Sequence, residues 1–123
     1  MDSITENFLR WNTQGISTSK EEIVNLINAY NPSVISIQET FLENEFMLKF
    51  GGYNGICKQG HYNNRYHGGA AIYTHSALPV EEIKLNTNYQ AVAVRVHTET
   101  MNFVTFASIY IHGRVKVQIN ELN

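Results

Sequence analysis

FLRWNTQGISTSKEEIVNLINAYNPSVISIQE, residues 8–39, has the pattern of a strand, a helix and a second strand. The aromatic and apolar run at 8–11 stops at turn-forming residues, and the mostly apolar run at 34–37 is followed by polar residues. Between them, Ser19 and Glu22 have the spacing of a capping box, and an Asn-Pro pair predicts the end of the helix. A strand, a crossover helix and a strand predict a parallel pair with a right-handed connection. The apolar stripe expected on this helix is Ile23, Leu26, Ile27 and Tyr30.

The chain beyond Thr40 has the pattern of an antiparallel β-meander. Valines alternate with other residues over 91–97, which predicts a strand with one buried face. A short helical segment is expected at 41–50 and an exposed polar loop at 59–67, and the Gly-Gly pair at 68–69 predicts a bulge or the entry to a strand. The strands expected in this part are 54–58, 68–74, 91–97 and 103–111.

The composition is that of a folded protein with a buried core. Of 123 residues, 43% are hydrophobic and 16% are charged, which is too apolar for a disordered chain and fits a single domain. Nine Lys and Arg against eleven Asp and Glu give a net charge of -2, which argues against binding of nucleic acid through bulk positive charge. A single cysteine and the absence of a secretory signal pattern predict a nuclear or cytoplasmic protein that is not secreted. No apolar run reaches the ~18 residues of a membrane-spanning helix, so no membrane association is expected.

Two polar residues stand where the strands of the first unit are expected to end. Asn12 lies just past the first strand and Glu39 just past the second. Because parallel strands end at one edge of a sheet, where open α/β sheets bind ligands, these residues are expected to share a polar site. Tyr110, near the end of the last expected strand, would add a phenol if that strand joins the same sheet in the matching direction. A carboxylate suited to Mg²⁺, an amide and a hydroxyl donor together suggest phosphate-ester chemistry.

Each of these three residues also has a purely structural interpretation. Asn12 is a common kind of turn residue, Glu39 is equally explained as a solvated residue, and a tyrosine such as Tyr110 in an apolar strand is more often part of the core. The five histidines show no spacing that matches a tetrahedral metal site.

Three further residues are candidates for contact with DNA. Lys58, His61 and Arg65 lie around an aromatic loop and have side chains that can contact a DNA backbone or groove. A solvated loop explains their pattern at least as well.

Five stretches in order resemble the endonuclease/exonuclease/phosphatase superfamily, and most of all the endonuclease domains of insect-type non-LTR retrotransposons. A single piece such as Gln-Glu-Thr is a weak signal, whereas the ordered set covers nearly the whole chain from Phe8 onward. The stretches are residues 8–15, the helix ending in Asn31-Pro32 with 34–40, 65–72, 85–96 and 108–110.

The resemblance implies one half of a four-layered α/β sandwich that hydrolyses phosphodiester bonds with Mg²⁺ or Mn²⁺. By that resemblance Asn12 is an active-site asparagine, Glu39 the metal-binding glutamate and Tyr110 a phosphate-contacting tyrosine. The implied partners are target DNA, which is nicked to prime reverse transcription, and a downstream reverse transcriptase. The histidine and glycine at 112–113 depart from the proline-containing turn that usually follows the family's tyrosine.

Residues 1–123 are therefore expected to form a single partial domain, truncated on its C-terminal side. The family's Asp-x-Asn and its C-terminal Asp-His pair have no counterpart in this sequence. Without a base that activates water, the chain is expected to be inactive alone and to expose apolar sheet surface.

Two other functions fit the same residues. One is a different phosphodiesterase or phosphatase of the superfamily, such as an abasic-site nuclease. The other is a decayed or domesticated module that binds nucleic acid or protein without catalysis.

Overall fold

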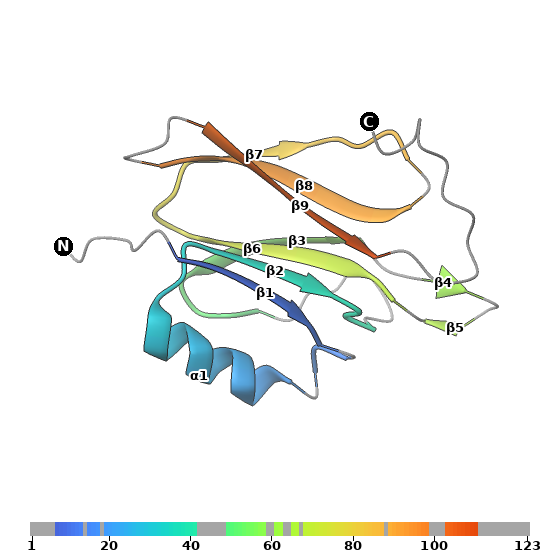
Figure 1. Cartoon of the computed structure of the whole chain (residues 1–123), viewed down its shortest axis with the longest axis horizontal. Helices are drawn as coiled ribbons and strands as arrows, with labels where there is room; N and C mark the ends of the chain where they lie inside the picture. The colour runs from blue at the N-terminus through green and yellow to red at the C-terminus, as the bar shows by residue number, and fades with distance from the viewer. Residues whose placement is uncertain are drawn as a thin grey trace.

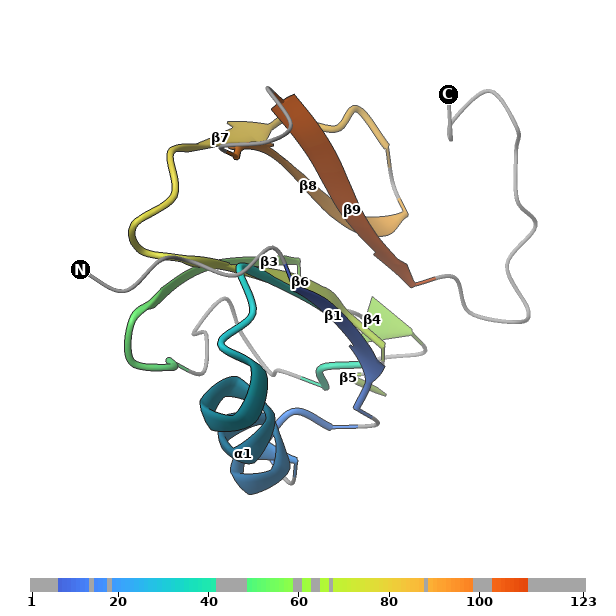
Figure 2. The same ribbon diagram turned by 60° about the vertical axis from the view of Figure 1, so that its left-hand side comes forward.

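The computed structural model describes residues 7–13, 15–17, 19–41, 49–58, 61–62, 65–66, 68–87, 89–98 and 103–110. Two β-sheets face each other, and one helix covers the outer face of the first sheet (Figures 1 and 2). In chain order the elements are β1 (Phe8–Asn12), α1 (Lys20–Tyr30), β2 (Val34–Gln38), β3 (Tyr53–Lys58), β4 (His61–Tyr62), β5 (Arg65–Tyr66), β6 (Ala70–His75), β7 (Val80–Ile83), β8 (Gln90–His97) and β9 (Phe103–Tyr110).

The first sheet is mixed and has the strand order β1-β2-β6-β3. Strands β1 and β2 are parallel, with Asn12 opposite Gln38, whereas β6 runs antiparallel to both of its neighbours. The expected strand-helix-strand unit is confirmed, and both of its strands extend one residue further than expected. The carboxyl ends of β1 and β2 therefore lie side by side at one edge of the sheet.

The second sheet is antiparallel and has the order β7-β8-β9. This confirms the expected antiparallel pairing of the strands at 91–97 and 103–111 and adds a first strand that the sequence pattern did not indicate. The expected strands at 54–58 and 68–74 are instead β3 and β6 of the first sheet. Strand β7 has the sequence VEEI and is largely exposed, so it lacks the alternation that marks a half-buried strand. Strand β9 lies in this second sheet rather than beside β1 and β2, so the condition under which Tyr110 was to reach their edge, that its strand joins the same sheet, is not met.

Two apolar layers hold the structure together, and β2 contributes to both because its side chains alternate in direction. On one face Ile35 and Ile37 pack with Ile23 of α1. On the other face Val34 packs with valines of β8 between the two sheets. Tyr30, expected on the buried stripe of the helix, is 53% exposed instead. The described residues thus form the layers helix, sheet and sheet of an α/β fold.

The ends of α1 agree only in part with the sequence pattern. Asn31 adopts a left-handed conformation with φ 44°, donates its N–H to Ile27 O at 2.8 Å, and ends the helix as expected. The prediction of a capping box at the start of the helix is wrong, because the Ser19 side chain makes no capping hydrogen bond. Its Oγ donates instead to Thr13 O at 3.2 Å and so ties the start of the helix to the loop that follows β1.

Several expectations fall in or near parts of the chain outside the described residues. Most of the helix expected at 41–50 lies there. Within the expected loop at 59–67, the short strands β4 and β5 pair with each other. Residues 68–69 lead directly into β6, which confirms the expected strand entry. Among the described residues, no helix has the length and apolar character needed to cross a bilayer.

Candidate active site

Asn12 and Glu39 meet at the carboxyl ends of β1 and β2. Asn12 Nδ2 donates a hydrogen bond to Glu39 Oε1 at 3.1 Å. The contact follows from the strand register, since Asn12 stands opposite Gln38 and Glu39 is the next residue. Asn12 is exposed and Glu39 is half-buried, so both can be reached from solvent. The two side chains therefore meet at the edge where the parallel strands predicted them, and their role in a shared site remains a prediction.

The backbone of Glu39 has a conformation that residues other than glycine rarely adopt. Its φ is 55°, in the left-handed region, a conformation that costs free energy and persists only where the surrounding structure holds it. Three hydrogen bonds hold it here. Glu39 N donates to Gly69 O at 2.9 Å, and Glu39 O accepts from Gly15 N at 2.7 Å and from Thr13 Oγ1 at 3.0 Å. The carboxylate is therefore presented by a rigidly held backbone.

Tyr110 reaches this edge from the second sheet. The arrowheads of β1, β2 and β9 point toward the same side of the molecule (Figure 1). Tyr110 is the last residue of β9, its ring lies against Gly68, and the charge of Glu39 acts on its phenol, so it lies near the same edge. Burial and the nearby Glu39 carboxylate both raise the pKa of the Tyr110 phenol above its ordinary value. The phenol is therefore protonated at neutral pH and can donate a hydrogen bond to an anionic ligand.

A glycine pair and a glutamine, which the sequence pattern did not connect with the site, hold the two sheets together here. Gly69 N donates to Gln90 Oε1 at 2.6 Å, while Gly69 O accepts from Glu39 N. Gly68 has φ +78° and lies so close to the Tyr110 ring that an added Cβ would overlap it. The positive φ expected of a Gly-Gly pair is a signal in the sequence, whereas the contact with Tyr110 is not.

The structure gives different information on the three residues expected to contact DNA. Lys58 Nζ donates to Thr87 O at 3.2 Å and to Tyr89 O at 2.8 Å, so it holds the segment that leads into β8. For His61 and Arg65 the structure describes the backbone alone, in the β4–β5 pair. The DNA contact of all three remains a prediction.

The donor atoms at the site fit a hard divalent cation such as Mg²⁺. Glu39 supplies a half-buried carboxylate oriented by Asn12. No cluster of three or more His, Cys, Asp and Glu side chains is found in the part of the chain that the structure describes. Mg²⁺ commonly binds through one or two carboxylates and completes its coordination with water and substrate phosphate, so one carboxylate is sufficient for such a site.

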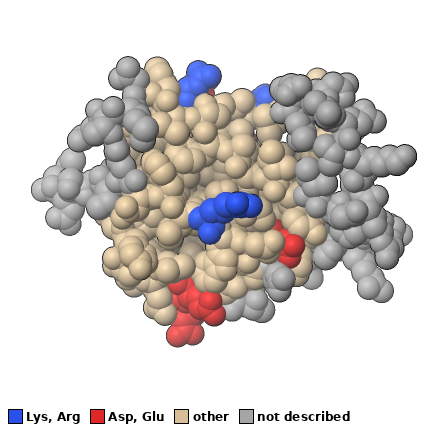
Figure 3. Space-filling view, in the orientation of Figure 1, with Lys and Arg blue, Asp and Glu red and all other residues tan. Residues whose placement is uncertain are grey.

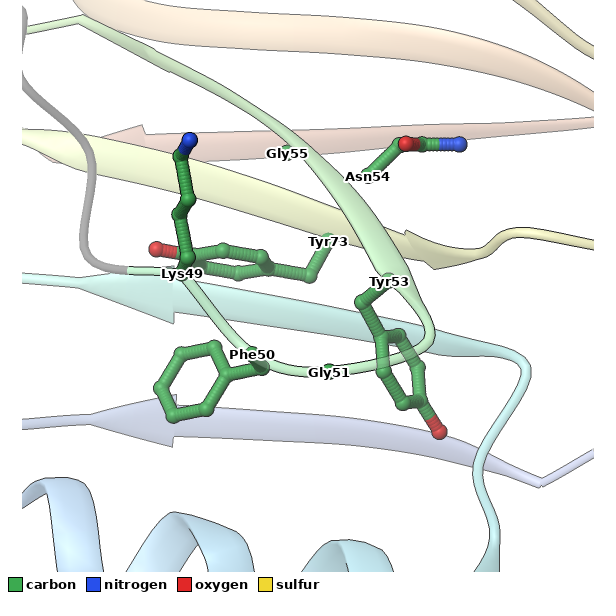
Figure 4. A pocket seen from close by; sticks show the side chains of 7 residues that line it. All are labelled: Lys49, Phe50, Gly51, Tyr53, Asn54, Gly55 and Tyr73. Carbon is green, nitrogen blue, oxygen red and sulfur yellow. The ribbon is translucent and has the colours of Figure 1, made fainter.

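Two surface features complete the description of the site's surroundings. Among the residues that Figure 3 colours, the Lys and Arg side chains lie apart from one another and form no basic patch, in keeping with the low net charge. A cavity of about 410 Å³ lies at β3 and is lined by Lys49, Phe50, Gly51, Tyr53, Asn54, Gly55 and Tyr73 (Figure 4). None of the three candidate site residues lines it, so the cavity and the candidate site are separate features.

Comparisons with known proteins agree with this architecture. A model of the Endonuclease/Exonuclease/phosphatase family matches residues 11–115. No curated protein gives a significant match. Among solved structures, the endonuclease domain of TRAS1, a telomere-specific non-LTR retrotransposon, aligns with a TM-score of 0.67 and 21% identity over 89% of this chain and 47% of that chain.

Two other nuclease or phosphatase structures are also similar. The 3' phosphatase NExo from Neisseria, bound to a product DNA hairpin, has a TM-score of 0.58 and 17% identity over 86% of this chain and 41% of that chain. An AP endonuclease from Archaeoglobus fulgidus has a TM-score of 0.50 and 18% identity over 80% of this chain and 40% of that chain. At such identities the likeness shows the fold, and the chain spans less than half the length of each structure.

Proposed function

Because the chain belongs to the Endonuclease/Exonuclease/phosphatase family, we propose that it is part of a metal-dependent DNA endonuclease domain, with Asn12, Glu39 and Tyr110 in the active site. The observation that carries the proposal is the hydrogen bond of 3.1 Å between Asn12 and Glu39 at the ends of two parallel strands. A structural role alone does not require a carboxylate held on a left-handed backbone at a solvent-accessible edge.

Each residue has a role that its chemistry allows. Glu39 would hold Mg²⁺ or Mn²⁺, which when bound stabilises the charge on phosphate and leaving oxygens. Asn12 orients the Glu39 carboxylate through Nδ2 and keeps its second oxygen available. Tyr110 donates its phenolic proton in a hydrogen bond to a phosphate oxygen, because its raised pKa keeps it protonated.

DNA is the proposed substrate, and nicking of a target strand for retrotransposition is the proposed role. The support is the similarity in fold to the TRAS1 endonuclease domain and to a phosphatase solved with a DNA hairpin. A downstream reverse transcriptase is the proposed partner. The net charge of -2 favours recognition through local contacts over a broad basic surface.

We further propose that residues outside this chain complete the active site. The chain spans 47% of the TRAS1 endonuclease domain. In-line hydrolysis also needs a group that activates water and a group that assists the leaving oxygen, and neither role falls to Asn12, Glu39 or Tyr110. The 123-residue chain alone is therefore expected not to hydrolyse DNA.

The test is a nicking assay on supercoiled plasmid with Mg²⁺ or with EDTA. It compares the 123-residue chain with the longest reading frame that encodes it. We expect that only the longer protein nicks the plasmid and that EDTA abolishes this activity. Glu39→Gln is expected to lower the rate of nicking by roughly a hundredfold or more. Glu82→Gln is the matched control, because Glu82 is an exposed glutamate of β7 in the second sheet, and it should keep the wild-type rate. Nicking that survives both EDTA and Glu39→Gln would refute the proposal.

Similarity to a 3' phosphatase and to an AP endonuclease favours a second candidate, another phosphodiesterase or phosphatase of the family. The same proteins are therefore assayed on a duplex with one abasic site and on a 3'-phosphorylated end. Hydrolysis of one of these with intact plasmid left uncut would select the second candidate. Binding of DNA that is independent of metal, with no hydrolysis of any substrate, would indicate a module without catalysis.

A further inference from the structure

A group of polar side chains interrupts the apolar layer between the two sheets next to the candidate site. Val34, Ser36 and Gln38 alternate along the face of β2 that is directed toward the second sheet. Val34 packs in the apolar layer, but the side chains become polar toward the end of the strand. Gln38 is 6% exposed and Ser108 of β9 is fully buried, so this polar group lies inside the protein.

Ser108 and Gln38 are joined by well-formed hydrogen bonds. Gln38 Nε2 donates to Ser108 Oγ at 2.8 Å and to Ser36 Oγ at 3.0 Å. Ser108 Oγ donates in turn to Ile37 O at 2.9 Å. Ser108 thus bonds to both the side chain and the backbone of β2, across the space between the sheets.

Hydrogen bonds constrain this interface in a way that apolar packing does not. Hydrophobic burial is non-directional, so valine packing between the sheets tolerates small shifts of one sheet along the other. A hydroxyl that must donate to the Ile37 carbonyl and accept from Gln38 has one position in which both bonds form. A shift of β9 would leave buried polar groups without partners, which is costly.

The two bonded residues lie close in the sequence to two of the proposed site residues. Glu39 follows Gln38 in the chain, and Tyr110 lies two residues after Ser108, on the same face of β9. We infer that Gln38 and Ser108 are positioning residues, whose hydrogen bond sets the place of the Tyr110 phenol relative to the Glu39 carboxylate. The catalytic consequence rests on the proposed function, whereas the positioning itself concerns the folded chain alone.

The test compares two serine-to-alanine variants. Ser108→Ala removes the bonds to Gln38 and Ile37. Ser33→Ala is the matched control, because Ser33 is 1% exposed and donates to the backbone carbonyl of Asn7 at 3.3 Å, but lies at the opposite end of β2 from Glu39. Both variants lose one buried hydroxyl that donates to a carbonyl. Ser108→Ala also removes the bond from Gln38 across the two sheets and lies near the site, whereas Ser33→Ala does neither.

Two measurements separate positioning from a general effect on stability. The first is the NMR cross-peak between the Tyr110 ring and the Gly68 Hα protons, which reports the contact in the 123-residue chain without any activity. The second is the rate of plasmid nicking by the longer protein. Ser108→Ala is expected to weaken the cross-peak and to lower kcat by roughly tenfold to a hundredfold with KM little changed. Ser33→Ala is expected to leave the cross-peak and the rate as in wild type.

An unchanged cross-peak in Ser108→Ala would overturn the inference, as would equal effects of the two variants. If the wild-type protein hydrolyses no substrate, the proposed function fails and the cross-peak alone decides on positioning. If Ser108→Ala does not fold, Gln38→Met removes the same bond from its other partner, and the cross-peak is measured in that variant. Loss of the cross-peak would then support the inference, and its retention would refute it.

Discussion

Replacement of Gly68 by alanine is expected to push the Tyr110 ring away from the candidate site. A Cβ at Gly68 would overlap Gln90 Oε1 and would lie 2.5 Å from Tyr110 Cδ2 and Cε2. Gly52 provides a matched control, because its φ of +82° is close to the +78° of Gly68 and nothing lies within 4 Å of its added Cβ. Both alanine variants place a side chain on a left-handed backbone, but only Gly68→Ala creates a collision.

The size of the effect follows from these distances. Non-bonded carbon atoms rest about 3.5–4.0 Å apart, so the ring must retreat by about 1 Å. The left-handed conformation costs roughly 1–2 kcal/mol in either variant. Overpacking adds about 1–3 kcal/mol at Gly68 alone. The free energy of unfolding should therefore fall by about 1–3 kcal/mol more in Gly68→Ala than in Gly52→Ala.

Urea unfolding of the two variants measures this difference, and the NMR signals of the Tyr110 ring measure the displacement. If the proposed function holds, nicking by the longer protein should fall by up to roughly a hundredfold in Gly68→Ala, since misplacement by 1 Å has effects of that order. Gly52→Ala should nick at the wild-type rate. Equal stabilities within about 0.5 kcal/mol, together with unchanged Tyr110 signals, would show that the packing argument is wrong.

Three further predictions concern other parts of the structure. Thr40→Val should leave the free energy of unfolding unchanged or raise it, because Thr40 Oγ1 is buried and lacks a hydrogen-bond partner among the described residues. A decrease in the free energy of unfolding of more than about 1 kcal/mol would contradict this. Lys58→Met should lower the free energy of unfolding in urea by about 2 kcal/mol, since the ammonium donates to the carbonyls of Thr87 and Tyr89; a cost below about 0.5 kcal/mol would argue against that role. Burial raises the pKa of Tyr73 well above its ordinary value of 10.0. The contribution of the buried Tyr73 side chain to stability is therefore complete below about pH 10. It is lost as the pH rises further, because the tyrosine then ionises in the unfolded state and not in the folded state. Urea midpoints measured from pH 9 to 11 should accordingly fall less steeply in Tyr73→Phe than in wild type, and parallel curves would refute the assignment.

Local patterns in the sequence predicted the first unit of the fold and the contact between two of the three candidate site residues. The two strands and the helix are each recognised from the spacing of apolar residues within a short stretch of sequence. A short strand-helix-strand connection gives a parallel pair with a right-handed crossover. The meeting of Asn12 and Glu39 follows from that arrangement, because parallel strands end at the same edge. The helix end at Asn31 was also predictable, since it depends on the conformational preferences of one residue.

Side chains that serve two local purposes were harder to interpret. Ser19 has the spacing of a capping residue, but its hydroxyl binds Thr13 O, a partner that belongs to the loop after β1. Strand β7 is short and largely exposed, and its two adjacent glutamates interrupt the alternation of apolar and polar residues by which strands are recognised. In both cases a partner elsewhere in the fold decides the structure: Thr13 O for Ser19, and β8 for β7.

Periodicity indicates that β9 has a buried face, but it does not say which sheet that face is directed toward. Tyr110 therefore lies at the candidate site only because the second sheet packs on the first. Ser108 of β9 is hydrogen-bonded to Gln38 of β2, which is 70 positions away in the sequence. The overlap between Gly68 and the Tyr110 ring likewise arises only when both sheets are assembled. Such contacts depend on the distance and direction between separate sheets, which side-chain packing and buried hydrogen bonds set together, and no periodic pattern along the chain encodes them.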